Sequence, residues 1–120
     1  IDVEATVKTI ADGLFVNKGP VGRGLRNDVG RMVVLDINGI EVIIPERRIQ
    51  PWDPEIFRRM GIEPTEKQIT VVKSSLHFRA AYGPIASEII EVDAPGITAA
   101  NFHQFNFKNL SRPIFPLDLI

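Results

Sequence analysis

The dipeptide Asn38-Gly39 constrains the fold most strongly, because it separates two largely apolar runs at residues 32–37 and 40–44. Asparagine followed by glycine tolerates positive φ at both central positions of a type I′ turn, which is a common two-residue hairpin connection. We therefore predict a β-hairpin centred on this pair. A chain of 120 residues has room for one hydrophobic core, so the hairpin should belong to a single domain.

The N-terminal segment predicts a second hairpin, because apolar and polar residues alternate over residues 3–10 and again over residues 14–17, on either side of Asp12-Gly13. The following residues, 18–24, contain three glycines and a proline, which predict a loop of tight turns. This loop lacks the spacing and the closing Lys-Ser or Lys-Thr of a phosphate-binding loop. Its glycines, Gly22 among them, instead favour a tight turn or a close approach to another domain.

A short helix is predicted after Asp53-Pro54-Glu55, which supplies a cap, a proline for the first turn and an acid near the positive end of the helix dipole. The spacing places Ile56, Phe57 and Met60 on the inward face and leaves Arg58 and Arg59 outside. Gly61 should end the helix, since glycine is the usual left-handed terminator.

The second half of the chain predicts a βαβ unit. Residues 68–73 are mostly β-branched and nearly continuously apolar, as in a central strand with both faces covered. Ser74-Ser75 can cap a helix over residues 76–82, and residues 87–92 return as a strand. The spacing suits a parallel, right-handed crossover. The predicted fold is α/β: a single domain with two β-hairpins and a βαβ unit, its mixed sheet flanked by short helices.

The end of the first βαβ strand is the strongest candidate for a binding site, because ligands bind at the carboxyl ends of strands in open α/β sheets. Polar side chains that could converge there on a carboxylate or phosphate are Lys73, Ser74, Ser75, His77 and Arg79. A structural interpretation stays open, in which Ser75 is a helix cap, His77 bonds a carbonyl, and Lys73 and Arg79 are solvated.

Composition excludes several other functions. The chain has no cysteine, which rules out a disulfide framework and a thiolate site and fits a cytoplasmic protein. Its two histidines, His77 and His103, form no zinc-binding spacing, so we expect no metal site. A net charge of −1 and acids interspersed among the arginines argue against a nucleic-acid partner. No apolar run approaches the ~18 residues of a membrane span.

Several segments, in matching order and spacing, resemble the C-terminal domain of the microcystinase C (MlrC) family. They are residues 47–50 (RRIQ), 53–58 (DPEIFR), 61–64 (GIEP), 71–80 (VVKSSLHFRA) and 112–118 (RPIFPLD). The similarity runs from about Gly19 to Asp118 and so covers most of the chain. One departure lies at Pro45-Glu46, where Thr-Ser commonly precedes the two arginines in that family. We therefore carry over no hydroxyl role at those positions.

The resemblance implies that the chain, residues 1–120, is a fragment of a longer polypeptide whose N-terminal domain holds the zinc of a peptidase or amidohydrolase. By this resemblance, residues 73–79 face an interdomain cleft and contact a peptide-like or carboxylate substrate or the N-terminal domain. Arg48 and Gly22 are secondary candidates for the same contact. No cofactor is expected in the fragment itself, which would be a substrate-cleft or supporting domain rather than a catalyst. Two alternatives stay open: a stand-alone anion- or protein-binding module, and a structural or dimerising domain that uses the aromatic C-terminal tail as an interface.

Overall fold

The computed structural model describes residues 2–94, 96, 99 and 101–118. The chain divides into two compact units, one up to residue 89 and one from residue 90 onward. The first unit contains the sheet and two short α-helices, and the second contains a 3-10 helix, η3 (Phe102–Gln104). All of the predicted site residues lie in the first unit.

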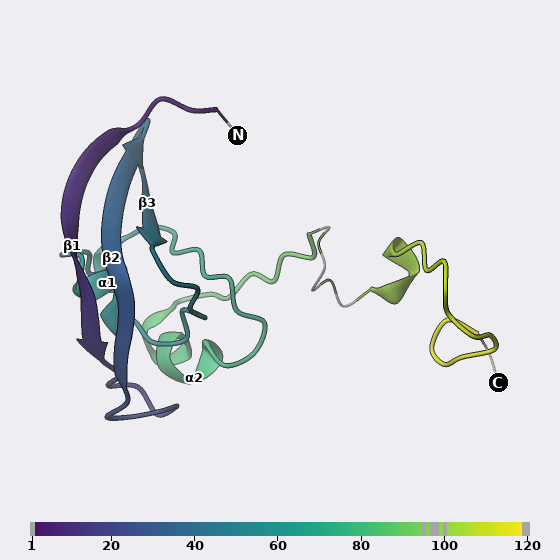
Figure 1. Cartoon of the computed structure of the whole chain (residues 1–120). Helices are drawn as coiled ribbons and strands as arrows, with labels where there is room; N and C mark the ends of the chain where they lie inside the picture. The colour runs from purple at the N-terminus through teal and green to yellow at the C-terminus, as the bar shows by residue number, and fades with distance from the viewer. Residues whose placement is uncertain (1, 95, 97–98, 100, 119–120) are drawn as a thin grey trace. The chain divides into compact units, whose positions relative to one another are not determined.

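The sheet has three antiparallel strands in the order β1 (Thr6–Val16), β2 (Arg26–Ile37) and β3 (Ile40–Pro45) (Figure 1). The hairpin at Asn38-Gly39 is confirmed: these residues have φ angles of 53° and 88°, and Ile37 pairs with Ile40. The Gly39 amide donates to the Asp36 carboxylate over 2.8 Å, which closes the turn further.

The predicted N-terminal hairpin is wrong, because β1 runs through Asp12-Gly13 without turning and pairs along its length with β2. Gly13 is buried where the register shifts between Asp12 and Leu14. A Cβ there would lie 2.3 Å from Val29 Cγ2 and 2.8 Å from the Gly30 carbonyl oxygen. Glycine is therefore needed for a close backbone approach at an irregularity in the strand pair, and not for a turn.

Helix α1 (Glu55–Arg58) forms where the sequence predicts it, and Gly61 follows with a φ of 76°. Ile56 and Met60 are buried, as predicted from their spacing. They join residues from β2 and the segment after α1 in one core cluster, which consists of Val29, Met32, Val34, Ile56, Met60 and Ile62. The core thus lies between the sheet and α1.

The predicted βαβ unit is wrong within the described part of the chain. Residues 68–73 and 87–92 form no strand, and the sheet contains only antiparallel pairs. The intervening helix α2 (Arg79–Tyr82) is shorter than predicted and continues as the 3-10 helix η2 (Gly83–Ile85). The 3-10 helix η1 (Pro64–Glu66) precedes the first of these segments. The apolar composition of residues 68–73 suits a strand, but within the described part of the chain no neighbouring strand pairs with it.

The second unit has its own local contacts. Asp118 pairs with the Arg112 guanidinium and accepts a hydrogen bond from the Ile114 amide over 2.7 Å. The pKa of the Asp118 carboxyl is lowered to about 2, chiefly by the hydrogen bond from Arg112. The Asn101 side chain accepts from the His103 amide at the start of η3. These contacts hold two local turns within residues 101–118.

Candidate functional site

Asp53 connects the glycine-rich loop to the start of α1. Its Oδ2 atom accepts hydrogen bonds from the amides of Lys18 and Gly19, over 3.0 and 2.7 Å, and Oδ1 accepts from the Glu55 amide over 3.0 Å. The residue is only 3% exposed, so its charge is satisfied by three backbone donors rather than by solvent. The sequence predicts Asp53 as a helix cap, whereas the structure has Pro54 at the N-cap position and Asp53 just before it, where it accepts from Glu55 and also holds the loop.

The loop is closed at its base by Asn17. The Asn17 amide donates to the Leu25 carbonyl over 3.0 Å, and the Asn17 carbonyl accepts from the Gly24 amide over 2.9 Å. Asn27 donates to the Asn17 side-chain oxygen over 2.7 Å. Gly22 has a φ of 62°, and a Cβ there would lie 3.3 Å from Asn17 Nδ2. The conformation of the loop therefore favours glycine at this position.

The extended segment after β3 lies beside the segment that carries the predicted site residues. Gln50 Nε2 donates to Ser74 Oγ over 2.8 Å. The rings of Trp52 and His77 meet edge to face, with their centroids 6.0 Å apart and their planes at 65°. Two side chains from residues 50–52 thus position two of the predicted residues, Ser74 and His77. The sequence alone assigns no role in the site to Gln50 or Trp52, although Trp52 is the chain's single tryptophan.

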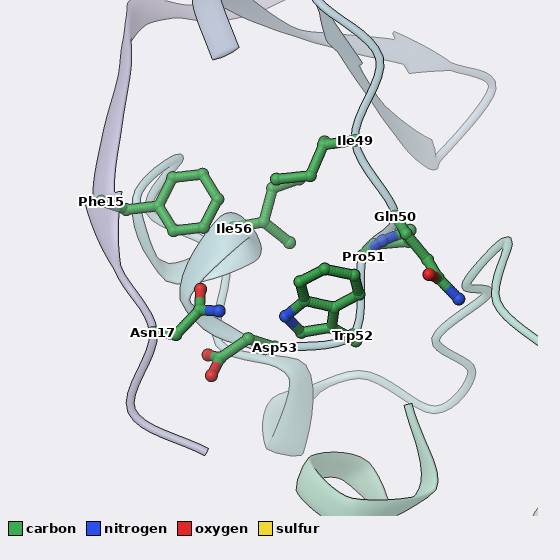
Figure 2. A pocket seen from close by; sticks show the side chains of 8 residues that line it. All are labelled: Phe15, Asn17, Ile49, Gln50, Pro51, Trp52, Asp53 and Ile56. Carbon is green, nitrogen blue, oxygen red and sulfur yellow. The ribbon is translucent and has the colours of Figure 1, made fainter. Parts of the chain in front are cut away.

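Behind these contacts lies a narrow crevice between β1, α1 and the segment that precedes α1. Figure 2 shows the side chains that line it: Phe15, Asn17, Ile49, Gln50, Pro51, Trp52, Asp53 and Ile56. Side chains fill this space so closely that it does not admit a water molecule. The crevice is therefore part of the packing that supports the site, and any ligand must bind on the outer surface.

The outer surface presents most of the predicted polar residues. Lys73, Ser75, His77 and Arg79 are exposed and Ser74 is half-buried. The Arg79 guanidinium lies 5.5 Å from the centroid of the buried Phe78 ring, close enough for a cation–π contact. Arg48 is also exposed, and among the described residues neither Arg48 nor Lys73 has an ion-pair partner.

The expected helix N-terminus at Ser75, which was predicted to help bind an anion, does not form. Helix α2 begins at Arg79, and its N-terminal neighbour Phe78 makes no side-chain cap, so Ser75 does not cap a helix. A four-residue helix also has too few aligned peptide dipoles to bind an anion at its N-terminus. Recognition at this surface would therefore depend on the side chains themselves.

Two buried polar groups close to this region have no hydrogen-bond partner among the described residues: the Asn17 side-chain nitrogen and the Tyr82 hydroxyl. Burial, together with the negative charge of Asp53, raises the pKa of the Tyr82 phenol well above its usual value. Tyr82 is thus a neutral hydroxyl at physiological pH. It packs edge to face against Phe57, which joins α2 to the helix beside the core.

The side chains of the described residues do not suit a resident metal, because no three of their histidines or carboxylates are grouped closely enough to hold one. His77 contacts Trp52, and His103 lies in the other unit. We therefore derive no chemical step through a metal in this chain. None of the helices in the described residues has the length and apolar character needed to cross a bilayer.

Comparison with known proteins identifies a family and two longer proteins that this chain resembles. Residues 1–109 match the family described as MlrC C-terminus. Microcystinase C from a Sphingomonas species is 28% identical over 118 residues, which are 98% of this chain and 22% of that protein. The crystal structure of a protein described as a "putative metallopeptidase" from Mesorhizobium sp. BNC1 superposes with a TM-score of 0.83 at 32% identity, over 97% of this chain and 23% of that one.

The fold is therefore that of a small domain found within much longer proteins. This chain matches less than a quarter of each of the two relatives. Specifically, the chain belongs to the MlrC C-terminus family. The resemblance seen in the sequence is thereby confirmed. The described residues of this chain contain no group of histidines and carboxylates that could hold a metal.

Proposed function

We propose that this chain is the C-terminal domain of a longer, zinc-dependent peptidase or amidohydrolase, in which it forms one wall of the substrate cleft. Family membership supports this proposal, as does the superposition on a metallopeptidase-like protein more than four times as long. The zinc would be held by residues outside this chain, because the donors among its described residues do not form a site.

The proposed contact surface consists of Lys73, Ser74, Ser75, His77 and Arg79, and Arg48 is a further candidate for the same contact. The observation that carries it is the pair of contacts from Gln50 to Ser74 and from Trp52 to His77, which hold polar groups in place on an otherwise exposed segment. Ammonium, guanidinium and imidazole donors suit a carboxylate or a peptide carbonyl, because charge-assisted hydrogen bonds are stronger than neutral ones. Their role is to bind and orient the substrate or the facing domain.

The test uses the full-length polypeptide that contains this chain. His77→Ala and Arg79→Ala should each lower kcat/KM for a peptide substrate by about tenfold or more, as expected for the loss of one charged hydrogen bond. The melting temperature should stay close to that of the parent. Arg26→Ala is the matched control, since Arg26 is an exposed cation in β2. If both site variants keep the kinetics of the parent, the assignment of the site is wrong.

A second candidate is a stand-alone module that binds an anion without chemistry, which the free cationic groups of Arg48 and Lys73 favour. A ligand that binds only the folded state raises the melting temperature. Citrate and inorganic phosphate should then stabilise the 120-residue chain, and Arg48→Ala combined with Lys73→Ala should abolish the effect. No change with either anion would leave the supporting-domain proposal in the lead.

A further inference from the structure

The segment that follows η1 lies outside any helix or strand and is largely apolar, and alternate residues in it are exposed. Ile69 and Val71 are 82% and 83% exposed, whereas the alternate residues Thr70 and Val72 are half-buried. This alternation is that of a strand with one face toward its own unit and the other toward solvent. Two β-branched side chains with more than four-fifths of their surface in water are costly to leave uncovered.

The backbone of the same segment also lacks backbone hydrogen-bond partners in the described part of the chain. Among the described residues, no backbone–backbone hydrogen bond involves residues 69–74. Backbone donors and acceptors in extended, apolar segments normally pair with a neighbouring strand. Residues 69–72 contain none of the charges or prolines that commonly protect an exposed strand edge from pairing.

The segment is nevertheless held in place at both ends. Before it, Lys67 forms an ion pair with Glu41 of β3 over 2.5 Å, and Lys8 of β1 joins the same carboxylate over 2.6 Å. After it, Ser74 accepts the hydrogen bond from Gln50. A strand fixed between two anchors is preorganised for pairing, because less conformational entropy is lost when a partner binds.

We propose that residues 69–72 form a strand of a second sheet, whose neighbouring strand is supplied by the rest of the longer polypeptide. This inference rests on the proposed function and names the surface through which the chain joins its catalytic partner. The amount of chain available supports that occupant, since the fold accounts for only 23% of the Mesorhizobium protein and 22% of the Sphingomonas protein. Main-chain pairing would supply affinity, and Ile69 and Val71 would be covered by the partner.

Such a strand would also determine where the proposed site lies. Lys73, Ser74 and Ser75 follow Val72 directly, so they would lie at the carboxyl end of the shared strand, at the junction of the two parts. The βαβ composition of the sequence then has a physical explanation. The segment has the composition of a strand covered on both faces because the longer polypeptide covers it.

The test is backbone hydrogen exchange in the full-length polypeptide. Because no described residue of this chain is a backbone partner for the amides of residues 69–72, we attribute strong protection there to a partner outside it. We expect alternate amides to exchange about 100-fold or more slowly than an unstructured reference. Val33 in β2 is the protected control, and Arg23 in the exposed loop is the unprotected one. Unprotected exchange at all four amides would overturn the proposal.

Paired variants identify the occupant. Ile69→Lys with Val71→Lys should expose the junction of the full-length polypeptide to limited proteolysis, whereas Ile10→Lys, at a 70% exposed position on β1, should not. Equal cleavage of both would overturn the inference. Protection that appears in the 120-residue chain alone and depends on its concentration would also overturn it, because the partner would then be a second copy.

If the amides are protected but His77→Ala and Arg79→Ala have no effect, the strand stands and the proposed site fails. If His77→Ala and Arg79→Ala lower the activity but the amides are unprotected, the proposed site stands and only the strand is rejected.

Discussion

Replacing Asp53 with alanine should strongly destabilise the first unit. The carboxylate accepts three backbone hydrogen bonds, from Lys18, Gly19 and Glu55, and is almost completely buried. Hydrogen bonds to charged groups contribute about 1.5–3 kcal/mol each in favourable cases, but losses at one residue are not additive. Solvent can reach the freed amides of the loop, so we expect a total loss of about 3 kcal/mol in the free energy of unfolding.

The assay is urea denaturation of the 120-residue chain, followed by the fluorescence of its single tryptophan, Trp52, which is next to Asp53. Asp53→Asn is the matched control, because it keeps one acceptor oxygen and the size of the side chain. It should lose about half as much as Asp53→Ala. A change below about 0.5 kcal/mol for Asp53→Ala, the range of ordinary surface substitutions, would refute the claim that this carboxylate holds the loop to α1.

Three further predictions concern packing and charge. Gly13→Ala should lower the free energy of unfolding by about 1–3 kcal/mol, because its Cβ would lie 2.3 Å from Val29, whereas Gly83→Ala, with open space around it, should be neutral. Met32→Ala should cost about 2–5 kcal/mol by opening a cavity in the core, measured by the same titration. The pKa of Glu63 is lowered from 4.5 to about 2, chiefly by the Arg58 hydrogen bond. Its contribution should therefore be present at pH 7 and fade as the pH falls from 4.5 toward 2, so the stability difference between the parent and Glu63→Gln should shrink in urea titrations between pH 7 and pH 3. A difference that is constant with pH would contradict this cause.

The elements that the sequence predicts correctly are those whose signals are local. Asn38-Gly39 needs only its own backbone preferences to form a turn, and α1 needs only a cap, a proline and a terminal glycine. Asp12-Gly13 misleads for the same reason, since Asp-Gly suits both a turn and a strand irregularity. The choice between them depends on Val29, which is distant in sequence and packs against Gly13.

The candidate site also depends on contacts that local sequence cannot predict. Residues 73–79 stand out by their polar groups, but the contacts from Gln50 and Trp52 that position them span more than twenty residues of sequence. Asp53 likewise has a local contact with the Glu55 amide at the start of α1 and a distant role as the acceptor for the loop, and the sequence gives no sign of the distant role. A single sequence identifies chemical groups, whereas their partners depend on the tertiary fold.

Residues 69–72 differ from both cases, because neither local preference nor the fold of this chain accounts for their composition. A β-branched run with this degree of exposure would favour aggregation in a free domain, and its side chains contribute little to the core of the first unit. Pairing with a longer polypeptide explains both the composition and the missing hydrogen bonds by one cause. Anchors at Lys67 and Ser74 fit the same cause, since a segment kept straight in advance pairs at a lower entropic cost.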